Sequence, residues 1–214
     1  MKRFGRILVI IAIVVALGFA IGKSMEKPSI VKDVWENSMT IGNLEAKNYF
    51  VVYSDLGCPY CVAFENAILD NETQFLDYIA KNDVLVEIRL SDYLYHTMGK
   101  KPSHLGAIAT FCAKGKELDY YKLAMRKLNI NNSGADEVAY WTDLGSNLAL
   151  GTEFEDCVEN ERTSSAVLNM TAKTIQNKIS GMPYFKFNRY TASGFNLNWG
   201  YEAIEAWFDA GLKS

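Results

Sequence analysis

The chain of 214 residues has few of the residues that bind metals or nucleic acids. It contains two histidines, His96 and His104, and four cysteines. A structural zinc site needs two ligand pairs at short spacing, and only one such pair is present. The formal charge is −3, with no basic cluster beyond the N-terminus. We therefore expect neither a metal site nor a nucleic-acid interface.

The sequence also lacks internal repeats, low-complexity segments and the signatures of nucleotide, flavin or haem binding. We therefore expect no bound cofactor. What is present is an ordinary globular composition, in which 49% of residues are hydrophobic and 22% are charged. Such a composition provides enough apolar side chains for a substantial core.

The N-terminus has the pattern of an export signal. Lys2, Arg3 and Arg6 precede an uncharged, mostly apolar run over residues 7–22, and a polar stretch follows over residues 23–28. By the positive-inside tendency, this pattern leaves the rest of the chain outside the cytoplasm. As a helix the run would span about 24 Å, which is long for a signal-peptide core and slightly short for a membrane span.

Residues 1–23 are therefore either a signal anchor or a signal peptide. On its length we favour an uncleaved single-pass anchor in the cell membrane, with the folded domain extracytoplasmic. Cleavage would instead give a periplasmic or secreted protein. We interpret residues 24–37 as a tether between this segment and the folded domain.

The motif that organises the chain is NYFVVYSDLGCPYCVAFENAIL, residues 48–69. The aromatic and β-branched run 49–53 predicts a buried strand, and residues 54–57 predict a turn. A helix is expected to begin at Cys58, because Pro59 is tolerated in a first turn and apolar residues follow at helical spacing. Cys58 is therefore expected where a strand passes into a helix N-terminus.

A cysteine in this position has the chemistry of thiol–disulfide exchange. Unpaired N–H groups and the positive end of the helix dipole stabilise a thiolate, so the pKa of Cys58 is expected below the free-thiol value of about 8.5. Cys61 lies one turn further along and can close a disulfide with Cys58. We expect Cys58 to be the exposed attacking sulfur and Cys61 the buried resolving sulfur.

Asp55 lies three residues before Cys58 and allows two interpretations. A partly buried acid with a raised pKa could accept the proton of Cys61 when a mixed disulfide resolves. An aspartate in this place could equally form the turn or cap the helix.

The remaining cysteines, Cys112 and Cys157, are isolated in the sequence. Disulfides persist outside the cytoplasm, so the simplest pairing joins Cys58 to Cys61 and Cys112 to Cys157. Two separate buried thiols are the alternative for Cys112 and Cys157.

The rest of the chain predicts an α/β architecture with a helical insertion. A helix over 72–81 and a strand over 84–90 complete a βαβ unit, whose two strands should be parallel. A helical block follows, with helices over 105–113, 118–128, 136–150 and 153–178. The chain then returns to strands over 184–188 and 195–199, joined by a turn at 191–194, and ends with a helix over 201–212.

This order and three motifs resemble the DsbA-type oxidoreductases of the thioredoxin fold. The motifs are SMTIGNLEAKNYFVVYSDLGCPYCVAFE, PSHLGAIATFCAKGKEL and SGMPYFKFN. The resemblance implies a thioredoxin fold (βαβ followed by ββα) with an inserted all-helical subdomain. Its first half would cover residues 38–102, the insertion residues 103–178 and the second half residues 179–214.

The resemblance also implies roles for single residues. Cys58 would be the nucleophile and Cys61 the resolving thiol, while Pro183 would be cis and lie against the active site. With the backbone of Met182, Pro183 would present an edge to an extended substrate chain. Pro59 and Tyr60, between the two cysteines, would join Met182 in contacting substrate.

The resemblance further implies that the protein catalyses disulfide formation in exported, cysteine-containing proteins. A quinone-linked membrane partner would reoxidise it. The methionine at position 182 and the absence of a histidine beside Tyr60 depart from the family's oxidising members, so a disulfide reductase or isomerase is an alternative. A tethered binding or chaperone domain, in which Cys58 and Cys61 form only a structural disulfide, is a further one.

Overall fold

The computed structural model of the chain describes residue 30, residues 32–128 and residues 133–214. Residues 32–214 form one compact unit. The expected signal or anchor segment and half of the expected tether lie outside the described residues. Within the described part, no helix combines the length and apolar character that crossing a membrane requires.

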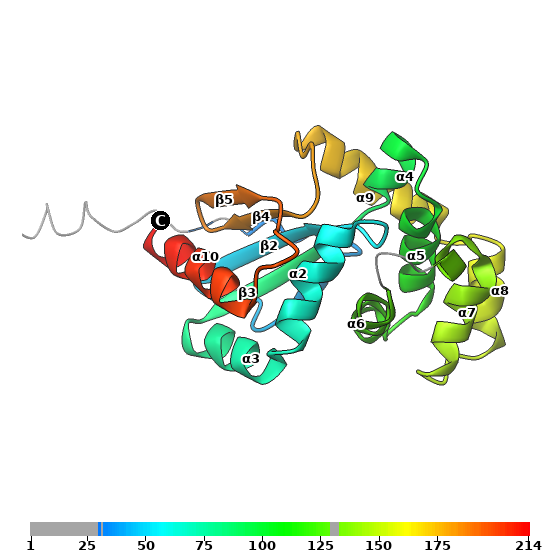
Figure 1. Cartoon of the computed structure of the whole chain (residues 1–214), viewed down its shortest axis with the longest axis horizontal. Helices are drawn as coiled ribbons and strands as arrows, with labels where there is room; N and C mark the ends of the chain where they lie inside the picture. The colour runs from blue at the N-terminus through cyan, green and yellow to red at the C-terminus, as the bar shows by residue number, and fades with distance from the viewer. Residues whose placement is uncertain (1–29, 31, 129–132) are drawn as a thin grey trace, which may run out of the picture. The chain divides into compact units, whose positions relative to one another are not determined.

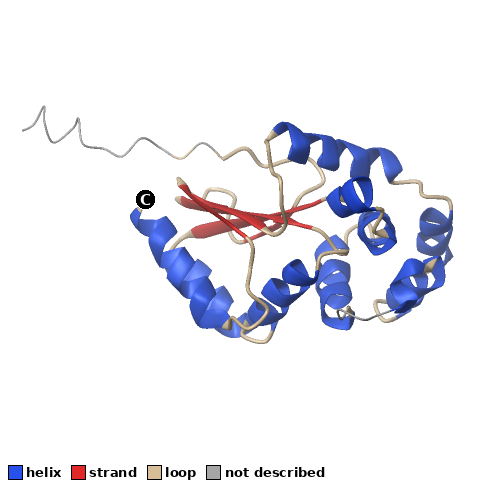
Figure 2. Cartoon of the chain, turned by 45° about the horizontal axis from the view of Figure 1, so that its top comes forward, coloured by secondary structure: helices blue, strands red, loops and turns tan. Residues whose placement is uncertain are grey.

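Five strands form one mixed sheet in the order β1-β3-β2-β4-β5 (Figures 1 and 2). Strands β2 and β3 are parallel and the other neighbouring pairs are antiparallel. The parallel pair confirms the βαβ unit expected from the sequence. The strands are β1 (Met39–Ile41), β2 (Asn48–Ser54), β3 (Val84–Leu90), β4 (Tyr184–Phe187) and β5 (Tyr190–Ser193).

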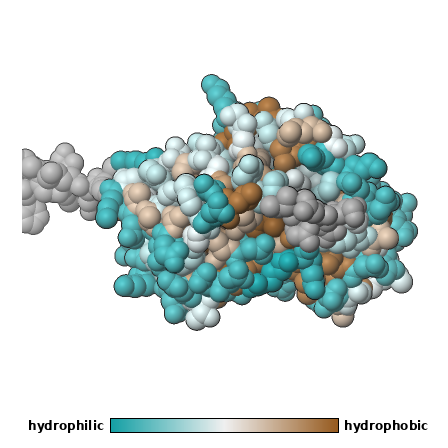
Figure 3. Space-filling view, viewed as in Figure 1, coloured by the Kyte–Doolittle hydropathy of each residue, from teal (hydrophilic) through white to brown (hydrophobic). Residues whose placement is uncertain are grey.

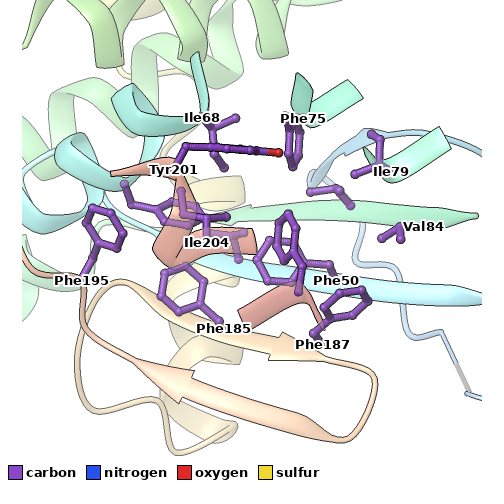
Figure 4. Close-up of a cluster of buried hydrophobic side chains, with 14 residues drawn as sticks. Phe50, Ile68, Phe75, Ile79, Val84, Phe185, Phe187, Phe195, Tyr201 and Ile204 are labelled. Carbon is purple, nitrogen blue, oxygen red and sulfur yellow. The ribbon is translucent and has the colours of Figure 1, made fainter. Parts of the chain in front are cut away.

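One face of the sheet carries the main hydrophobic core (Figure 4). Phe50 and Val52 of β2 point to this face because alternate residues of a strand share a side. Three helices cover it, namely α2 (Pro59–Leu69), α3 (Glu72–Lys81) and α10 (Tyr201–Lys213). Phe208 of α10 packs against Phe50 with ring centroids 4.6 Å apart. Phe64 of α2 in turn packs against Phe185 of β4 with ring centroids 4.6 Å apart, so the core holds α2 against the sheet.

The other face of the sheet holds a buried ion pair beneath the segment 32–37. Arg89 and Glu87 of β3 lie 2.9 Å apart, and both are almost fully buried. Trp35 covers them, with the Arg89 guanidinium 3.9 Å from its ring centroid. The backbone N–H of Trp35 donates to the Glu87 carboxylate at 2.7 Å. The end of the segment interpreted as a tether is therefore packed against the sheet.

The inserted helices follow β3 and gather beyond the carboxyl end of β2 and β3 (Figure 1). They are α4 (Tyr93–Met98), α5 (Lys101–Cys112), α6 (Glu117–Lys127), the 3₁₀ helix η1 (Ser133–Asp136), α7 (Val138–Ser146), α8 (Thr152–Glu159) and α9 (Ser164–Gln176). The short helix α4 was not expected from the sequence. The face shown in Figure 3 is mostly hydrophilic, with hydrophobic residues in separate groups.

The expected single helix over 153–178 is wrong, because the structure divides it into α8 and α9. Glu161 adopts a left-handed backbone conformation with φ of 46° between the two helices. Cys157 ties α8 to α5 through its disulfide with Cys112. Thr171 of α9, however, contacts Asp92 next to the sheet. The chain must therefore change direction between these two attachments.

The positions expected for the turn and the second strand of the last hairpin are also wrong. The turn lies at Asn188 and Arg189, so β5 ends at Ser193, and residues 195–199 form a loop. Asn188 sets this position, because its side chain accepts the Tyr49 N–H at 2.9 Å and donates to the Gly211 carbonyl at 3.1 Å. Its left-handed φ of 53° is one that asparagine tolerates.

The disulfide between Cys112 and Cys157 joins residues 45 apart, with 5.8 Å between the two Cα atoms. Closing a loop of this size restricts the unfolded chain and is worth about 4 kcal/mol on the loop-entropy account. We predict that Cys112→Ala/Cys157→Ala lowers the free energy of unfolding by about 2 to 4 kcal/mol, measured by denaturant titration. An unchanged unfolding midpoint would show that the bond carries no stability.

Candidate active site

Cys58 lies at the junction of the central strand and its helix, as the sequence predicts. Strand β2 ends at Ser54, and Cys58 is the extended N-cap residue of α2, with φ of −100° and ψ of 113°. Its N–H donates to the Asp55 carbonyl at 3.1 Å, which closes the intervening turn. Pro59 occupies the first helical turn, where its missing N–H leaves no partner unsatisfied.

The expectation of an exposed Cys58 is wrong. Cys58 is 3% exposed and Cys61 is completely buried. The sulfur of Cys58 lies 3.5 Å from the Met182 carbonyl oxygen, to which its thiol can donate. Because this carbonyl covers the sulfur, a substrate has to approach from the groove beside Cys58. Both cysteines are free thiols here, so the structure represents the reduced pair.

The two thiols have opposite acidities. A hydrogen bond from the Cys61 thiol lowers the pKa of Cys58, and the N–H groups of Cys61 and Tyr60 act in the same direction. Burial and the negative charge of Asp55 oppose them, but the net direction is downward. Burial raises the pKa of Cys61 well above its usual value, and the adjacent Cys58 sulfur adds to the effect. Cys58 is therefore the thiol that ionises first.

Asp55 is completely buried and accepts three hydrogen bonds. One carboxylate oxygen accepts the Gly57 N–H at 2.7 Å, and the other accepts the Leu94 N–H and the Ser103 hydroxyl, both at 2.8 Å. Burial raises its pKa to about 6, although these hydrogen bonds favour the charged form. Asp55 therefore fits both interpretations made from the sequence. Its carboxylate organises the turn, and its pKa of about 6 allows it to exchange a proton near neutral pH.

Met182 and Pro183 approach the cysteines from the segment just before strand β4. The peptide bond between them is cis. Their position follows from the antiparallel pairing of β4 with β2, which sets Tyr184 opposite Tyr53. The Pro183 carbonyl accepts the Gly194 N–H at 2.8 Å, whereas the Met182 carbonyl faces the Cys58 sulfur.

A groove of about 780 Å³ runs along the site. Cys58, Pro59, Tyr60 and Met182 all line it, and the Tyr60 side chain is 47% exposed. The groove continues toward the α4–α5 turn and η1, where the helical insertion forms its other wall. Cys112 and Cys157 form a separate disulfide between α5 and α8 and do not line the groove.

Glu65 is a buried acid near the site that sequence reasoning missed. It lies one helical turn after Cys61, and burial raises its pKa to about 7. The Tyr121 hydroxyl lies 2.7 Å from the Glu65 carboxylate and 2.7 Å from the Ser54 hydroxyl. An acidic residue between the core residues Phe64 and Ile68 of α2 was the sequence signal that could have revealed Glu65.

A second missed cluster surrounds Asp92 at the start of α4. His104 Nδ1 lies 2.7 Å from one of its carboxylate oxygens, and His96 Nε2 lies 3.3 Å from the other. The hydrogen bond to Asp92 raises the pKa of His104. The two histidines are eight positions apart in sequence, so only the α4–α5 fold brings them to one carboxylate. Within the described residues, no group of three or more potential ligands is arranged to hold a metal ion.

The sequence profile of a family described as Thioredoxin matches residues 35–210. The chain belongs to the DsbA-like thioredoxin family. It is therefore a DsbA-like thiol–disulfide oxidoreductase, with Cys58 and Cys61 as its Cys-x-x-Cys pair. No curated protein sequence matches the chain.

Solved structures share the α/β fold with its helical insertion. Oxidised BdbD from Bacillus subtilis is 19% identical, with a TM-score of 0.65 over 82% of this chain and 92% of that one. Wolbachia pipientis alpha-DsbA1 is 15% identical, with a TM-score of 0.64 over 84% and 92%. A thioredoxin-like oxidoreductase from Silicibacter pomeroyi is 19% identical, with a TM-score of 0.61 over 84% and 95%.

The raised pKa of Asp55 predicts a stability that falls with rising pH. Below pH 3.8 the carboxyl is protonated in the folded and unfolded protein alike, and between 3.8 and about 6 only the folded protein keeps the proton. The stabilisation is therefore complete at low pH and is lost as pH rises through about 6, by about 3 kcal/mol for two pKa units.

Denaturant titrations from pH 4 to pH 8 test this loss. Asp55→Asn should flatten the decline between pH 4 and pH 6. The comparison variant Glu65→Gln should flatten it closer to pH 7, where the Glu65 carboxyl titrates. Parallel pH profiles for wild type and Asp55→Asn would contradict the assignment.

A substitution at Gly57 tests how closely the turn before Cys58 packs on α5. A Cβ added at Gly57 would lie 2.9 Å from the Ser103 Cβ and 3.0 Å from the Ser103 backbone nitrogen. We predict that Gly57→Ala costs about 1 to 3 kcal/mol of unfolding free energy. Gly181→Ala is the matched control, because nothing lies within 4 Å of its added Cβ, and it should change stability by less than about 1 kcal/mol.

Proposed function

We propose that this protein is an extracytoplasmic thiol oxidase that introduces disulfides into exported proteins. The observation that carries the proposal is the placement of Cys58 at the N-cap of α2 with Cys61 fully buried one turn deeper, an arrangement in which the pKa of Cys58 is lowered and that of Cys61 is raised. A stabilised Cys58 thiolate favours the reduced form of the pair. A disulfide whose reduced form is stabilised is a strong oxidant and is readily transferred to a substrate.

The proposed reaction begins with the disulfide between Cys58 and Cys61. A substrate thiolate attacks the Cys58 sulfur, the enzyme disulfide breaks, and Cys61 leaves with the electron pair. Cys61 takes up a proton because its pKa is raised. The second substrate thiolate then attacks the substrate sulfur of the mixed disulfide and releases Cys58 as its thiolate. The substrate loses two electrons, and the reduced enzyme holds them.

Asp55 is proposed to exchange a proton with Cys61. Its backbone N–H hydrogen-bonds the Cys61 sulfur, which places the residue beside this thiol, and its carboxyl has a pKa of about 6. Near neutral pH the carboxylate can accept the proton when Cys61 attacks a mixed disulfide. The protonated carboxyl can return it when Cys61 is the leaving group.

The backbone of Met182 and Pro183 is proposed to hold the substrate chain. Met182 lines the groove, and its carbonyl is aimed at the reactive sulfur. An extended segment could pair with this edge in the manner of an added strand. Pro59 and Tyr60 would contact the same segment from the start of α2.

The location and the electron acceptor are inferred from different observations. The apolar run 7–22 after three basic residues supports export and a membrane anchor. The bond between Cys112 and Cys157 suits an oxidising compartment. Reduced enzyme needs an external oxidant for the next cycle, and a quinone-linked membrane protein could supply it to a tethered enzyme.

A disulfide reductase or isomerase is the second candidate, and two observations favour it. Tyr60 places no positive charge between the cysteines, and the negative charge of Asp55 opposes the Cys58 thiolate. Both effects would weaken the oxidising power of the pair. The balance between these groups and the N–H donors of α2 decides the direction of electron flow.

The redox potential of the Cys58–Cys61 pair, measured by equilibration with glutathione buffers, distinguishes the two candidates. We predict a value toward the oxidising end of the family, about −120 mV, because the Cys58 thiolate is stabilised. A value near about −270 mV would instead identify a reductase. Cys58→Ser/Cys61→Ser is the control, because it should remove the redox transition and leave the bond between Cys112 and Cys157 intact.

A further inference from the structure

The groove beside Cys58 has an apolar floor and a basic rim. Tyr60 forms one edge, and the other edge is the α4–α5 turn, where the Met98 side chain is 67% exposed. Lys100 and Lys101 follow Met98 after Gly99 and also line the groove. The apolar lining residues between these edges are Leu56, Val62, Leu94, Pro102, Leu128 and Met182.

The turn that carries the two lysines is held in place by the active site itself. Asp55 accepts hydrogen bonds from Leu94 in α4 and from Ser103 in α5, on either side of the turn. Gly99 adopts a left-handed φ of 68°, and its N–H donates to the Tyr95 carbonyl at 2.9 Å. The rim of the groove is therefore fixed relative to the turn that precedes Cys58.

The charges of Lys100 and Lys101 are not neutralised by the residues that the structure describes. Both side chains are exposed, and no acidic side chain of residues 32–128 or 133–214 forms an ion pair with either. Lys122, by contrast, pairs with Glu72 at 2.6 Å. Asp136 is the one acidic residue among the described residues that line the groove. Positive charge is therefore in excess beside the reactive sulfur, although the chain as a whole is negative.

We propose that this groove selects substrate segments in which a large apolar side chain and a carboxylate side chain lie beside the reacting cysteine. The apolar side chain would cover the groove floor and the exposed Met98, and the aspartate or glutamate would face Lys100 and Lys101. The proposal rests on the proposed function, since it takes a cysteine-containing polypeptide as the substrate. Electrostatic complementarity of this kind acts mainly on the association rate and on specificity.

The test uses two synthetic peptides, each with two cysteines and an apolar residue beside the first cysteine. They differ only at one neighbouring position, which is glutamate in one peptide and lysine in the other. The second-order rate of oxidation of each peptide by the oxidised full chain is divided by the rate with dithiothreitol, which carries no charge. We expect the glutamate peptide to react about 3- to 10-fold faster than the lysine peptide at low salt. The ratio should approach one at high salt.

Lys100→Glu/Lys101→Glu should invert this preference. The matched control is Lys81→Glu/Lys114→Glu, which changes the net charge equally at exposed positions outside the groove and should keep the wild-type ratio. Equal rates for the two peptides with wild type, or the same change of ratio in both variants, would overturn the proposal. Failure to oxidise dithiothreitol would instead count against the proposed oxidase function, so the two failures are distinguishable.

Discussion

The buried carboxylate of Asp55 connects the parts of the structure on which the active site depends. It accepts hydrogen bonds from the turn before Cys58, from the first turn of α4 and from Ser103 of α5. Without these acceptors, buried N–H and O–H groups would lose their partners, at about 1 to 3 kcal/mol each. The same burial raises its pKa to about 6. One side chain therefore fixes the geometry of the site and holds a proton equilibrium near neutral pH.

The chemistry of the site follows from the direction in which α2 leaves the sheet. Cys58 lies at the helix N-terminus, where the Cys61 thiol and then the N–H donors of α2 favour its thiolate, while Cys61 lies one turn deeper, where burial disfavours ionisation. Asp55 opposes both thiolates by its charge, so it moderates the acidity of Cys58. The redox behaviour of the pair is set by these opposing effects. The packing of Phe64 of α2 against Phe185 of β4 in the core keeps the helix in this position.

The sequence predicted the parts of the fold that depend on local patterns. The run 49–53, Pro59 and the spacing of Cys58 and Cys61 were sufficient to locate the strand, the helix and the reactive pair, because each acts through its neighbours in the chain. Asn188 was not recognised as a turn residue, because what fixes it is a contact with Tyr49, far away in sequence.

Long-range contacts explain the other differences as well. The partners of Asp55 come from α4 and α5, nearly 40 and 50 residues away, so no local pattern reveals them. Cys58 was expected to be exposed, but the carbonyl of Met182, just before strand β4, covers it. The basic rim at Lys100 and Lys101 likewise becomes part of the site only when the insertion folds beside α2.

The acidity of Cys58 tests the central claim most directly, because the account attributes the reactivity of the site to a thiolate stabilised at the start of α2. The ultraviolet absorbance of the thiolate can be titrated in the reduced full chain, with Cys58→Ser identifying the signal of this residue. The account predicts a midpoint clearly below the free-thiol value of about 8.5. A midpoint at or above that value would mean that burial and Asp55 outweigh the helix N-terminus, and it would contradict the account.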